Sequence, residues 1–379
     1  MGLSVELSGQ TRFGPGVVAE LPECVARLGY TRAFVVTDRG LRRTGIVERV
    51  AKILAGAGME HAVHDDLGPN PAMAELDRGA LALTGFGPAV VVAVGGGSAL
   101  DAAKGISLLA GNPGAGAADA DTLWEARDGM PLIAVPTTAG TGAETNGFGV
   151  VEDPRTRKKV YIGHSSVRPR TALLDPELTL GLPGPITAST GMDALVHGIE
   201  SLASRGANPF SAAYATHAVT VVGRWLPVAF RDGADLDARS QLMWGAHLAG
   251  HALTLSGLGL VHGIGHAVTA HTGTPHGVAL AAVLAEVMAF SAPAAGPAYE
   301  TVARALGVTA VPDDPTTAAI RAVAEIRDAI AIKRPLRELG VTRDLLPVIA
   351  ADAVADAVTK NSPRLPDRSE VLDLLRSVY

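Results

Sequence analysis

The first half of the chain alternates short apolar runs, rich in β-branched residues, with segments of helical periodicity. Strong runs at 33–37, 89–94 and 132–135 predict buried strands, and weaker ones are expected near 61–64, 147–151, 159–162 and 171–174. Helical spacing occurs between them, at 41–57, 71–84 and 98–110. This alternation is typical of βαβ units and predicts an α/β domain with a mainly parallel sheet.

After about residue 180 the strand-like runs end, and helical periodicity continues to the C-terminus. Clusters of Gly and Pro interrupt it near 181–185, 256–259, 272–277 and 292–297. The 379 residues are enough for two or three domains of roughly 150 residues each. We therefore expect an α/β domain over 1–180 and an all-α domain over 181–379.

The composition excludes several classes of protein. With 47% hydrophobic and 18% charged residues, the chain is too apolar to be intrinsically disordered. The net charge of −6 and the scattered basic residues argue against a nucleic-acid partner. Its single cysteine, Cys24, cannot form an internal disulfide, and the first ten residues lack the pattern of a secretory signal. We therefore expect a cytoplasmic protein.

Two long stretches lack Asp, Glu, Lys and Arg and have to be tested as membrane spans. The stretch 79–100 contains six glycines and Pro88, which interrupt it before it reaches roughly 20 apolar residues. The stretch 240–285 contains six of the eleven histidines, which are costly in lipid. We expect neither to cross a membrane, and we interpret the second as a buried polar site in the helical domain.

A glycine-rich turn separates the apolar run 89–94 from the helix predicted to follow it. Gly95, Gly96 and Gly97 allow backbone N–H groups to approach an anion, and the helix start favours a phosphate. The spacing fits neither the usual dinucleotide fingerprint nor the P-loop. Ser98 and Asp101 also fit a capping box, so a purely structural role for these two residues stays open.

A second turn of small residues, PTTAGTGAET at 136–145, follows the run 132–135. The carboxyl ends of neighbouring parallel strands meet at the crevice where open α/β sheets bind ligands, so the two turns together predict a nucleotide site. Asp38 ends the first strand, where a carboxylate can accept hydrogen bonds from an adenosine ribose and repel a 2′-phosphate. By residue type alone, an Asp in a loop or at an N-cap is nearly as good an explanation.

Histidines and one aspartate are arranged as metal ligands usually are. Asp193 and His197 stand four residues apart, on one face of a predicted helix, and His262 and His266 repeat this spacing. His276 follows 14 residues after His262. One carboxylate with several imidazoles suits a divalent Zn or Fe ion. Single buried histidines are more often hydrogen-bonded core residues, and we interpret four others in this way: His217, His247, His251 and His271.

The segments GGGSALDAAKG, PTTAGTGAET, GMDALVHGIES and GLGLVHGIGH…PHG, in this order, resemble the iron-containing (group III) alcohol dehydrogenases. The resemblance extends over essentially the whole chain. It implies an N-terminal dinucleotide-binding domain, a helical C-terminal domain as in dehydroquinate synthase, and a metal in the cleft between them.

The resemblance also implies roles for individual residues. The family's four metal ligands match Asp193, His197, His262 and His276. A family histidine implicated in proton relay matches His266. The nucleotide-binding positions match Gly95, Gly96, Gly97, Ser98, Asp101, Thr137, Thr138 and Thr141. Asp38 matches a position where an acid favours NAD over NADP, and Lys159 falls near a lysine that contacts the cofactor.

The expected activity is hydride transfer between NAD(H) and a small alcohol or aldehyde, with Fe²⁺ preferred over Zn²⁺ as the metal. Family members imply a homodimer. Three alternatives remain: a maleylacetate reductase-like enzyme, a dehydroquinate synthase-like lyase, and a non-redox metal-binding protein. The complete ligand set argues against the maleylacetate reductase-like enzyme, and the paired turns argue against the non-redox metal-binding protein. The dehydroquinate synthase-like lyase needs a basic pocket, and the scarcity of lysine in the helical domain argues against it.

Overall fold

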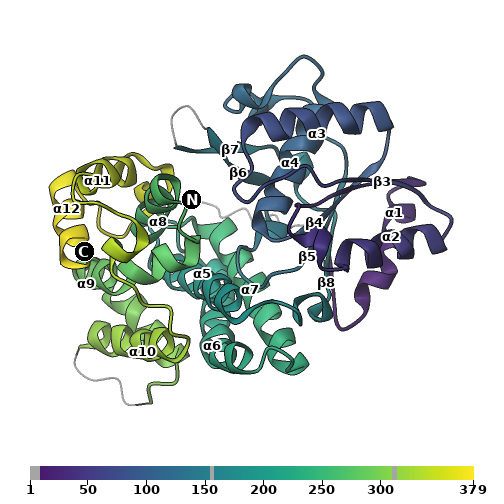
Figure 1. Cartoon of the computed structure of the whole chain (residues 1–379). Coiled ribbons are helices and arrows are strands. Elements are labelled where there is room, and N and C mark those ends of the chain that lie inside the picture. The colour runs from purple at the N-terminus through teal and green to yellow at the C-terminus, as the bar shows by residue number, and fades with distance from the viewer. Residues whose placement is uncertain (1–8, 154–157, 310–313) are drawn as a thin grey trace. The chain divides into compact units, whose positions relative to one another are not determined.

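The computed structural model describes residues 9–153, 158–309 and 314–379. These residues divide into two compact units (Figure 1). The sheet unit extends to Thr138 and includes Ala143–Gly181, and the helical unit comprises Ala139–Gly142 and Leu182–Tyr379.

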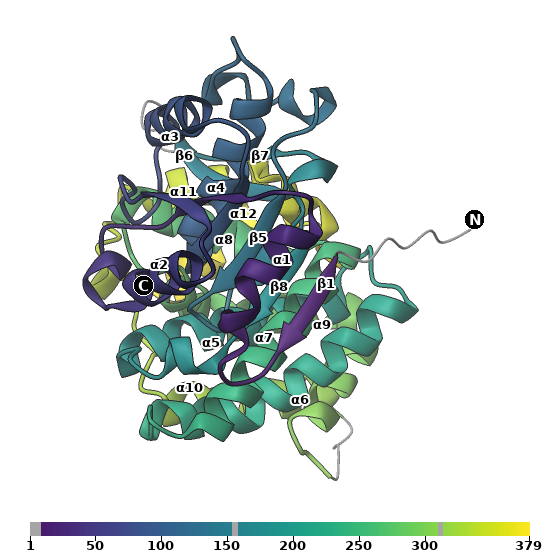
Figure 2. The same ribbon diagram turned by 90° about the vertical axis from the view of Figure 1, so that its right-hand side faces the viewer.

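Six parallel strands form the sheet of the first unit, in the order β1-β8-β5-β4-β2-β3. Their bounds are β1 Gln10–Phe13, β2 Arg32–Val36, β3 Glu60–His64, β4 Val90–Gly95, β5 Leu132–Pro136 and β8 Thr171–Leu174. Figure 2 shows β1 beside β8. The chain passes from β2 outward to β3 and then returns to β4 on the other side of β2. The order therefore reverses between β2 and β4.

Helices cover both faces of this sheet, which explains why β4 and β5 are apolar and buried at every position. Val91 and Ala93 of β4 pack with α3 (Met73–Phe86) and α4 (Gly97–Gly111). Val90, Val92 and Val94 face the opposite core, which contains α1 (Leu21–Arg27) and α2 (Ile46–Gly56).

Three details differ from the sequence prediction. Strand β1 was not expected, because its sequence QTRF is polar and mostly exposed, as suits a strand at the edge of a sheet. Strands β6 (Phe148–Asp153) and β7 (Lys158–Gly163) form a separate antiparallel pair instead of joining the parallel sheet. The helix expected over 41–57 is interrupted: a 3₁₀ turn at Leu41–Arg43 precedes α2, and Gly45 between them has φ +84°.

The described part of the second unit contains helices and no strands. Its α-helices are α5 Gly184–Ala203, α6 Pro209–Arg231, α7 Leu236–Ser256, α8 Leu260–Thr272, α9 His276–Ala305, α10 Pro315–Ala329, α11 Leu346–Ala355 and α12 Arg368–Ser377. A short 3₁₀ helix, η9, follows α11 at Ala357–Asn361.

Helix α9 is the only helix in the described residues that is long and apolar enough to cross a membrane, judged by length and composition. It begins at His276 and packs against α5, α8 and α10. More than half of its most apolar window is buried inside the protein. We therefore interpret α9 as a core helix of the helical unit.

Candidate active site

The glycine-rich turn lies at the carboxyl end of β4, where the strand order reverses. Gly95 ends β4 with φ +152°, and a Cβ atom there would lie 2.6 Å from the Cβ of Ala99. Gly96 is the N-cap of α4 and makes no side-chain cap hydrogen bond. The turn therefore needs glycine for its own geometry, and it places a helix N-terminus at the topological switch point, a position where open sheets bind nucleotides.

The second turn lies directly beside the first. Thr137 N donates to Gly95 O at 2.9 Å. A Cβ atom on Gly96 would lie 3.3 Å from Cγ2 of Thr138. Thr141 belongs to the short segment that groups with the helical unit. In that segment Gly142 lies so close to Gly250 of α7 that a Cβ atom would clash with it.

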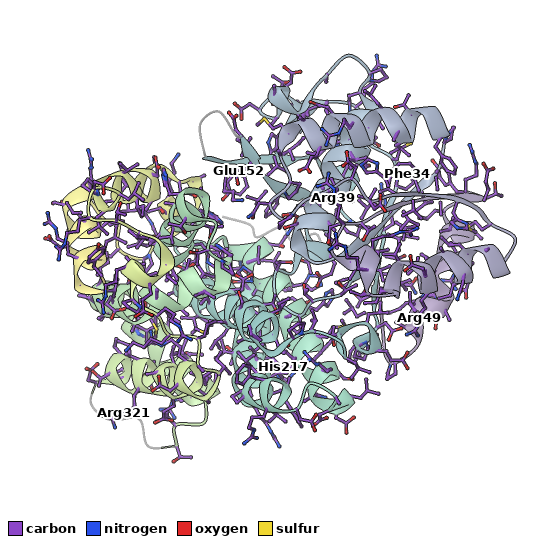
Figure 3. All side chains as sticks on the ribbon, in the orientation of Figure 1. Phe34, Arg39, Arg49, Glu152, His217 and Arg321 are labelled. Atoms are coloured by element: carbon purple, nitrogen blue, oxygen red, sulfur yellow. The ribbon has the colours of Figure 1, made fainter. Side chains whose placement is uncertain are left out.

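Asp38 serves as the cap that was one of the two explanations for it, and its ribose role stays a prediction. Its Oδ1 accepts hydrogen bonds from the N–H groups of Gly40 (2.8 Å) and Leu41 (2.9 Å), so it caps the 3₁₀ turn before α2. Its Oδ2 faces Gly95 of the glycine-rich turn. The neighbouring Arg39, labelled in Figure 3, is paired with Asp66 and lies 3.7 Å from Glu75.

Asp101 is engaged inside the protein through both carboxylate oxygens. Oδ1 lies 3.3 Å from the ammonium of Lys104, and Oδ2 accepts from Val150 N at 3.1 Å. Lys104 is fully buried and also donates to Asn146 Oδ1 (2.8 Å) and to Phe148 O (2.6 Å). The pair ties α4 to the start of β6. Neither Asp101 nor Ser98 forms the capping box that the sequence allowed, since α4 has no side-chain cap.

Lys159 lies on β7 opposite Glu152, which Figure 3 labels. Its ammonium is 3.2 Å from Asn70 Oδ1 and 3.7 Å from Glu152. Burial lowers the pKa of Lys159 from its ordinary value. Asn70 has φ +56°, unusual for a residue other than glycine.

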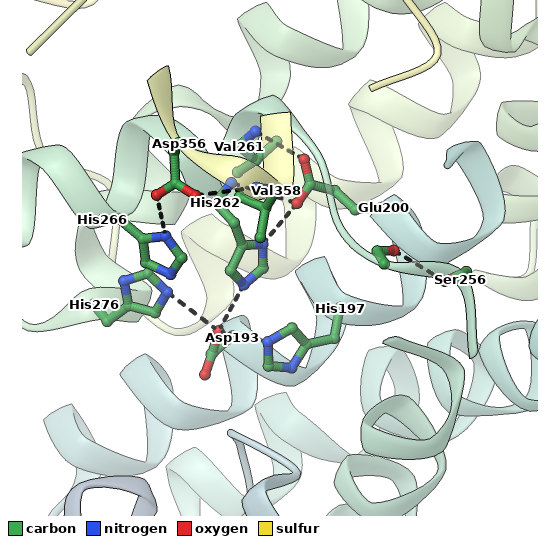
Figure 4. Close-up of polar contacts among 11 residues, drawn as sticks. Asp193, His197, Glu200, Ser256, Val261, His262, His266, His276, Asp356 and Val358 are labelled. Atoms are coloured by element: carbon green, nitrogen blue, oxygen red, sulfur yellow. Dashed lines mark hydrogen bonds and ion pairs between the residues drawn. The ribbon is translucent and has the colours of Figure 1, made fainter. Parts of the chain in front are cut away.

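The four candidate metal ligands converge within the helical unit (Figure 4). Asp193 and His197 come from α5, His262 from α8 and His276 from the first position of α9. One oxygen of Asp193, Oδ1, lies 3.4 Å from Nε2 of His197, 3.4 Å from Nε2 of His262 and 3.9 Å from Nε2 of His276. The ligand atoms of Asp193, His262 and His276 all lie within 4.8 Å of one another.

This donor set fits a divalent ion. Three imidazoles directed at one carboxylate oxygen at 3.4–3.9 Å make poor hydrogen bonds, whereas an ion can accept a lone pair from each of them. The rings of His197 and His262 stack with centroids 4.7 Å apart. The carboxylates of Asp193 and Glu200, both buried, would together balance two positive charges in surroundings that otherwise make a charge costly.

The electrostatics of the cluster show how strongly its members interact. Burial lowers the pKa of His197 to about 4 and that of His276 well below its ordinary value. For His262 burial acts in the same direction, but hydrogen bonds with Asp193 and Glu200 outweigh it and raise its pKa to about 9. The pKa of Asp193 is lowered, because the three histidines outweigh the opposing effect of burial.

His266 lies next to this cluster. Its ring stacks on His276 with centroids 5.2 Å apart, and its Nδ1 lies 2.8 Å from Asp356 Oδ2. A carboxylate can only accept a hydrogen bond, so the Nδ1 of His266 carries the hydrogen and its Nε2 is the atom that can exchange a proton.

The four other histidines of the helical unit lie outside this cluster. His247 and His251 lie on α7 with their Nε2 atoms 3.2 Å apart, and Tyr214 stacks on His251. His271 pairs with Asp352 at 2.8 Å. His217, labelled in Figure 3, is exposed on α6, so its interpretation as a buried core residue was wrong.

Two acidic residues beside the cluster were missed by the sequence reasoning. Glu200 hydrogen-bonds Nδ1 of His262 at 2.6 Å, and Asp356 hydrogen-bonds His266. A signal existed for Glu200, which stands three residues after His197 and seven after Asp193, on the same face of α5. No comparable signal marked Asp356, since its distance from His266 along the chain is 90 residues.

Models of one protein family match most of the sequence. The iron-containing alcohol dehydrogenase model matches residues 8–176, and the model for the C-terminal part of the same family matches residues 187–379. The chain belongs to the iron-containing alcohol dehydrogenase family.

Individual members of the family are similar along their whole length. The chain is 33% identical over 374 residues to lactaldehyde reductase of Escherichia coli K12, covering 97% of each chain. A crystal structure of 1,3-propanediol oxidoreductase superimposes with a TM-score of 0.94 at 31% identity and full coverage of both chains. Sulfoacetaldehyde reductase of Bifidobacterium kashiwanohense, solved with NAD⁺, gives 0.89 at 28% identity, covering 100% of this chain and 99% of that one.

Membership of the family confirms the predicted architecture of this dehydrogenase and its activity as an oxidoreductase that interconverts alcohols and aldehydes. The predicted use of NAD(H) together with a divalent metal is confirmed as well. These findings favour the oxidoreductase over the lyase and the non-redox alternatives.

Proposed function

We propose that this chain reduces short-chain aldehydes, or oxidises the corresponding alcohols, with NAD(H) in preference to NADP(H). The observation that carries the proposal is the convergence of three imidazole Nε2 atoms on one oxygen of Asp193. In this proposal, Asp193, His197, His262 and His276 hold the metal. A divalent ion bound there supplies Lewis-acid polarisation of the substrate oxygen, and NAD(H) carries the hydride.

The residues of the chain bind, orient and handle protons around these groups. The turn Gly95–Ser98, with Thr137, Thr138 and Thr141, binds the nucleotide phosphates. Asp38 accepts hydrogen bonds from the ribose and repels a 2′-phosphate. His266, with Asp356 fixing its Nδ1–H, exchanges the substrate proton at Nε2. Lys159 contacts the cofactor from β7.

The same proposal assigns the nucleotide to residues 1–180 and the metal and substrate to residues 181–379. Relatives named for lactaldehyde and sulfoacetaldehyde support a short aldehyde, either neutral or anionic. We further propose a cytoplasmic homodimer. Light scattering of the purified protein tests whether it is a dimer.

The decisive experiment compares two variants in an aldehyde-dependent NADH oxidation assay, with the bound metal quantified in parallel. His262→Ala should lose metal and turnover together, because it removes a ligand. His266→Ala should keep its metal and lose turnover. Full activity of metal-free protein would overturn the proposal.

A further inference from the structure

The carboxylate of Glu200 connects helix α5 to the first turn of α8, beside the candidate metal ligands (Figure 4). Its Oε2 lies 2.6 Å from Nδ1 of His262, and its Oε1 accepts a hydrogen bond from Val261 N at 2.7 Å. The His262 N–H lies 3.4 Å from the same carboxylate. Glu200 is only 7% exposed, so these contacts are shielded from water.

Helix α8 depends on Glu200 for its N-terminal cap. The first N–H groups of a helix need acceptors from outside it, and the N-cap residue of α8, Gly259, has no side chain to provide one. A Cβ atom on Gly259 would lie 3.0 Å from Glu200 Oε1. Glycine at this position therefore leaves room for a carboxylate from another helix, and negative charge is favourable at a helix N-terminus.

The same carboxylate determines which nitrogen of His262 faces the cluster. A carboxylate accepts and does not donate, so Nδ1 keeps its hydrogen, and Nε2 is the nitrogen that gives up its proton when a metal binds. That Nε2 lies 3.4 Å from Asp193 Oδ1, on the side where the other ligands converge. Histidines that bind metals usually donate their other N–H to such a partner, which fixes the orientation of the ring.

We propose that Glu200 positions His262 for metal binding, by fixing its ring and by anchoring the helix start that carries it. The proposal rests on the proposed function, because it takes His262 to be a ligand. Glu200 is a positioning residue: it acts through His262, and its loss should weaken metal binding.

The test compares Glu200→Gln with Asp352→Asn in otherwise intact protein. Asp352, on α11, pairs with His271 of α8 at 2.8 Å. This control therefore also removes a carboxylate–imidazole contact to α8, but one outside the ligand set. Gln is preferred to Ala because Glu200 lines a small cavity that truncation would enlarge. The Gln side chain keeps the size of Glu but has only one accepting oxygen, so it cannot serve both His262 and Val261.

The dissociation constant for Zn²⁺ is measured by competition with a chelator, starting from metal-free protein. We expect Glu200→Gln to bind Zn²⁺ about 10–100-fold more weakly than the wild type, and Asp352→Asn to stay within about threefold. Circular dichroism of the metal-free proteins separates a binding defect from unfolding.

A second measurement needs no variant. In Zn²⁺-loaded wild-type protein with ¹⁵N-labelled histidine, NMR should show His262 with hydrogen on Nδ1. The inference is overturned if Nδ1 binds the metal, or if Glu200→Gln binds Zn²⁺ as tightly as the wild type. Wild-type protein that binds no Zn²⁺ would instead overturn the proposed function, and this inference with it.

Discussion

The buried pair of Asp101 and Lys104 permits a quantitative test of how the helix after the glycine-rich turn is supported. The family resemblance assigns Asp101 to cofactor binding, whereas both of its oxygens are engaged by Lys104 and by Val150 N. If the contact is structural, Asp101→Asn and Lys104→Met should lower the stability of the sheet unit. The Michaelis constant for NADH should change little at temperatures where the variants are folded.

The size of the effect follows from burial. Lys104 is fully buried, and the Asp101 side chain is 17% exposed, so little solvent screening weakens the pair. Removing one partner of a buried ion pair costs about 3–5 kcal/mol, since the other charge is left without compensation. For a domain of this size, about 2–4 °C per kcal/mol gives a fall of about 6–20 °C in the unfolding temperature.

Calorimetry at a fixed scan rate measures this change, with Glu60→Gln as the matched control. Glu60 pairs with Arg32 at 2.6 Å but is 63% exposed, so its loss should cost less than about 1 kcal/mol. The double variant D101N/K104M should be less destabilised than the sum of the two single variants, by about 0.5–3 kcal/mol. An Asp101→Asn protein that melts like the control while its Michaelis constant for NADH rises strongly would refute the structural role.

Three further predictions test other parts of the structure. Asp38→Ser should raise the NADPH-to-NADH activity ratio about tenfold or more, because it removes a charge that opposes a 2′-phosphate; an unchanged ratio in steady-state kinetics would contradict this. Gly277→Ala should destabilise the helical unit in thermal unfolding, since its Cβ would lie 1.8 Å from Ser189 O, whereas Gly85→Ala, with open space around it, should be neutral or stabilising by up to about 1 kcal/mol. Cys24 should react slowly with a thiol reagent at pH 8, because burial raises the pKa of its thiol and the thiolate is the reactive form; rapid reaction of native protein would show that the site is open.

The sequence predicted those parts of the fold that local pattern controls. The central strands β2, β4 and β5 carry continuous apolar runs because both faces of the sheet are covered, and Asp193 and His197 share a helix face because of their spacing. Strand β1 was not predicted, because an edge strand need not be apolar. The break at Gly45 was missed because the apolar spacing continues on both sides of it.

The contacts between distant segments were the harder part. Glu200 and Asp356 act on histidines 62 and 90 residues away, and only the packing of α5, α8 and the start of η9 brings them together. Asp101 stands four residues after the last glycine of the glycine-rich turn, but which way its carboxylate points depends on the buried Lys104 and on β6. Local spacing cannot reveal either relation.

Anomalous X-ray diffraction from crystals grown with Fe²⁺ or Zn²⁺ tests the central claim most directly. The structure predicts a single strong peak in the helical unit, roughly 2.0–2.2 Å from an oxygen of Asp193 and from Nε2 of His197, His262 and His276. A peak elsewhere, or metal-loaded crystals in which these four side chains bind no ion, would contradict it.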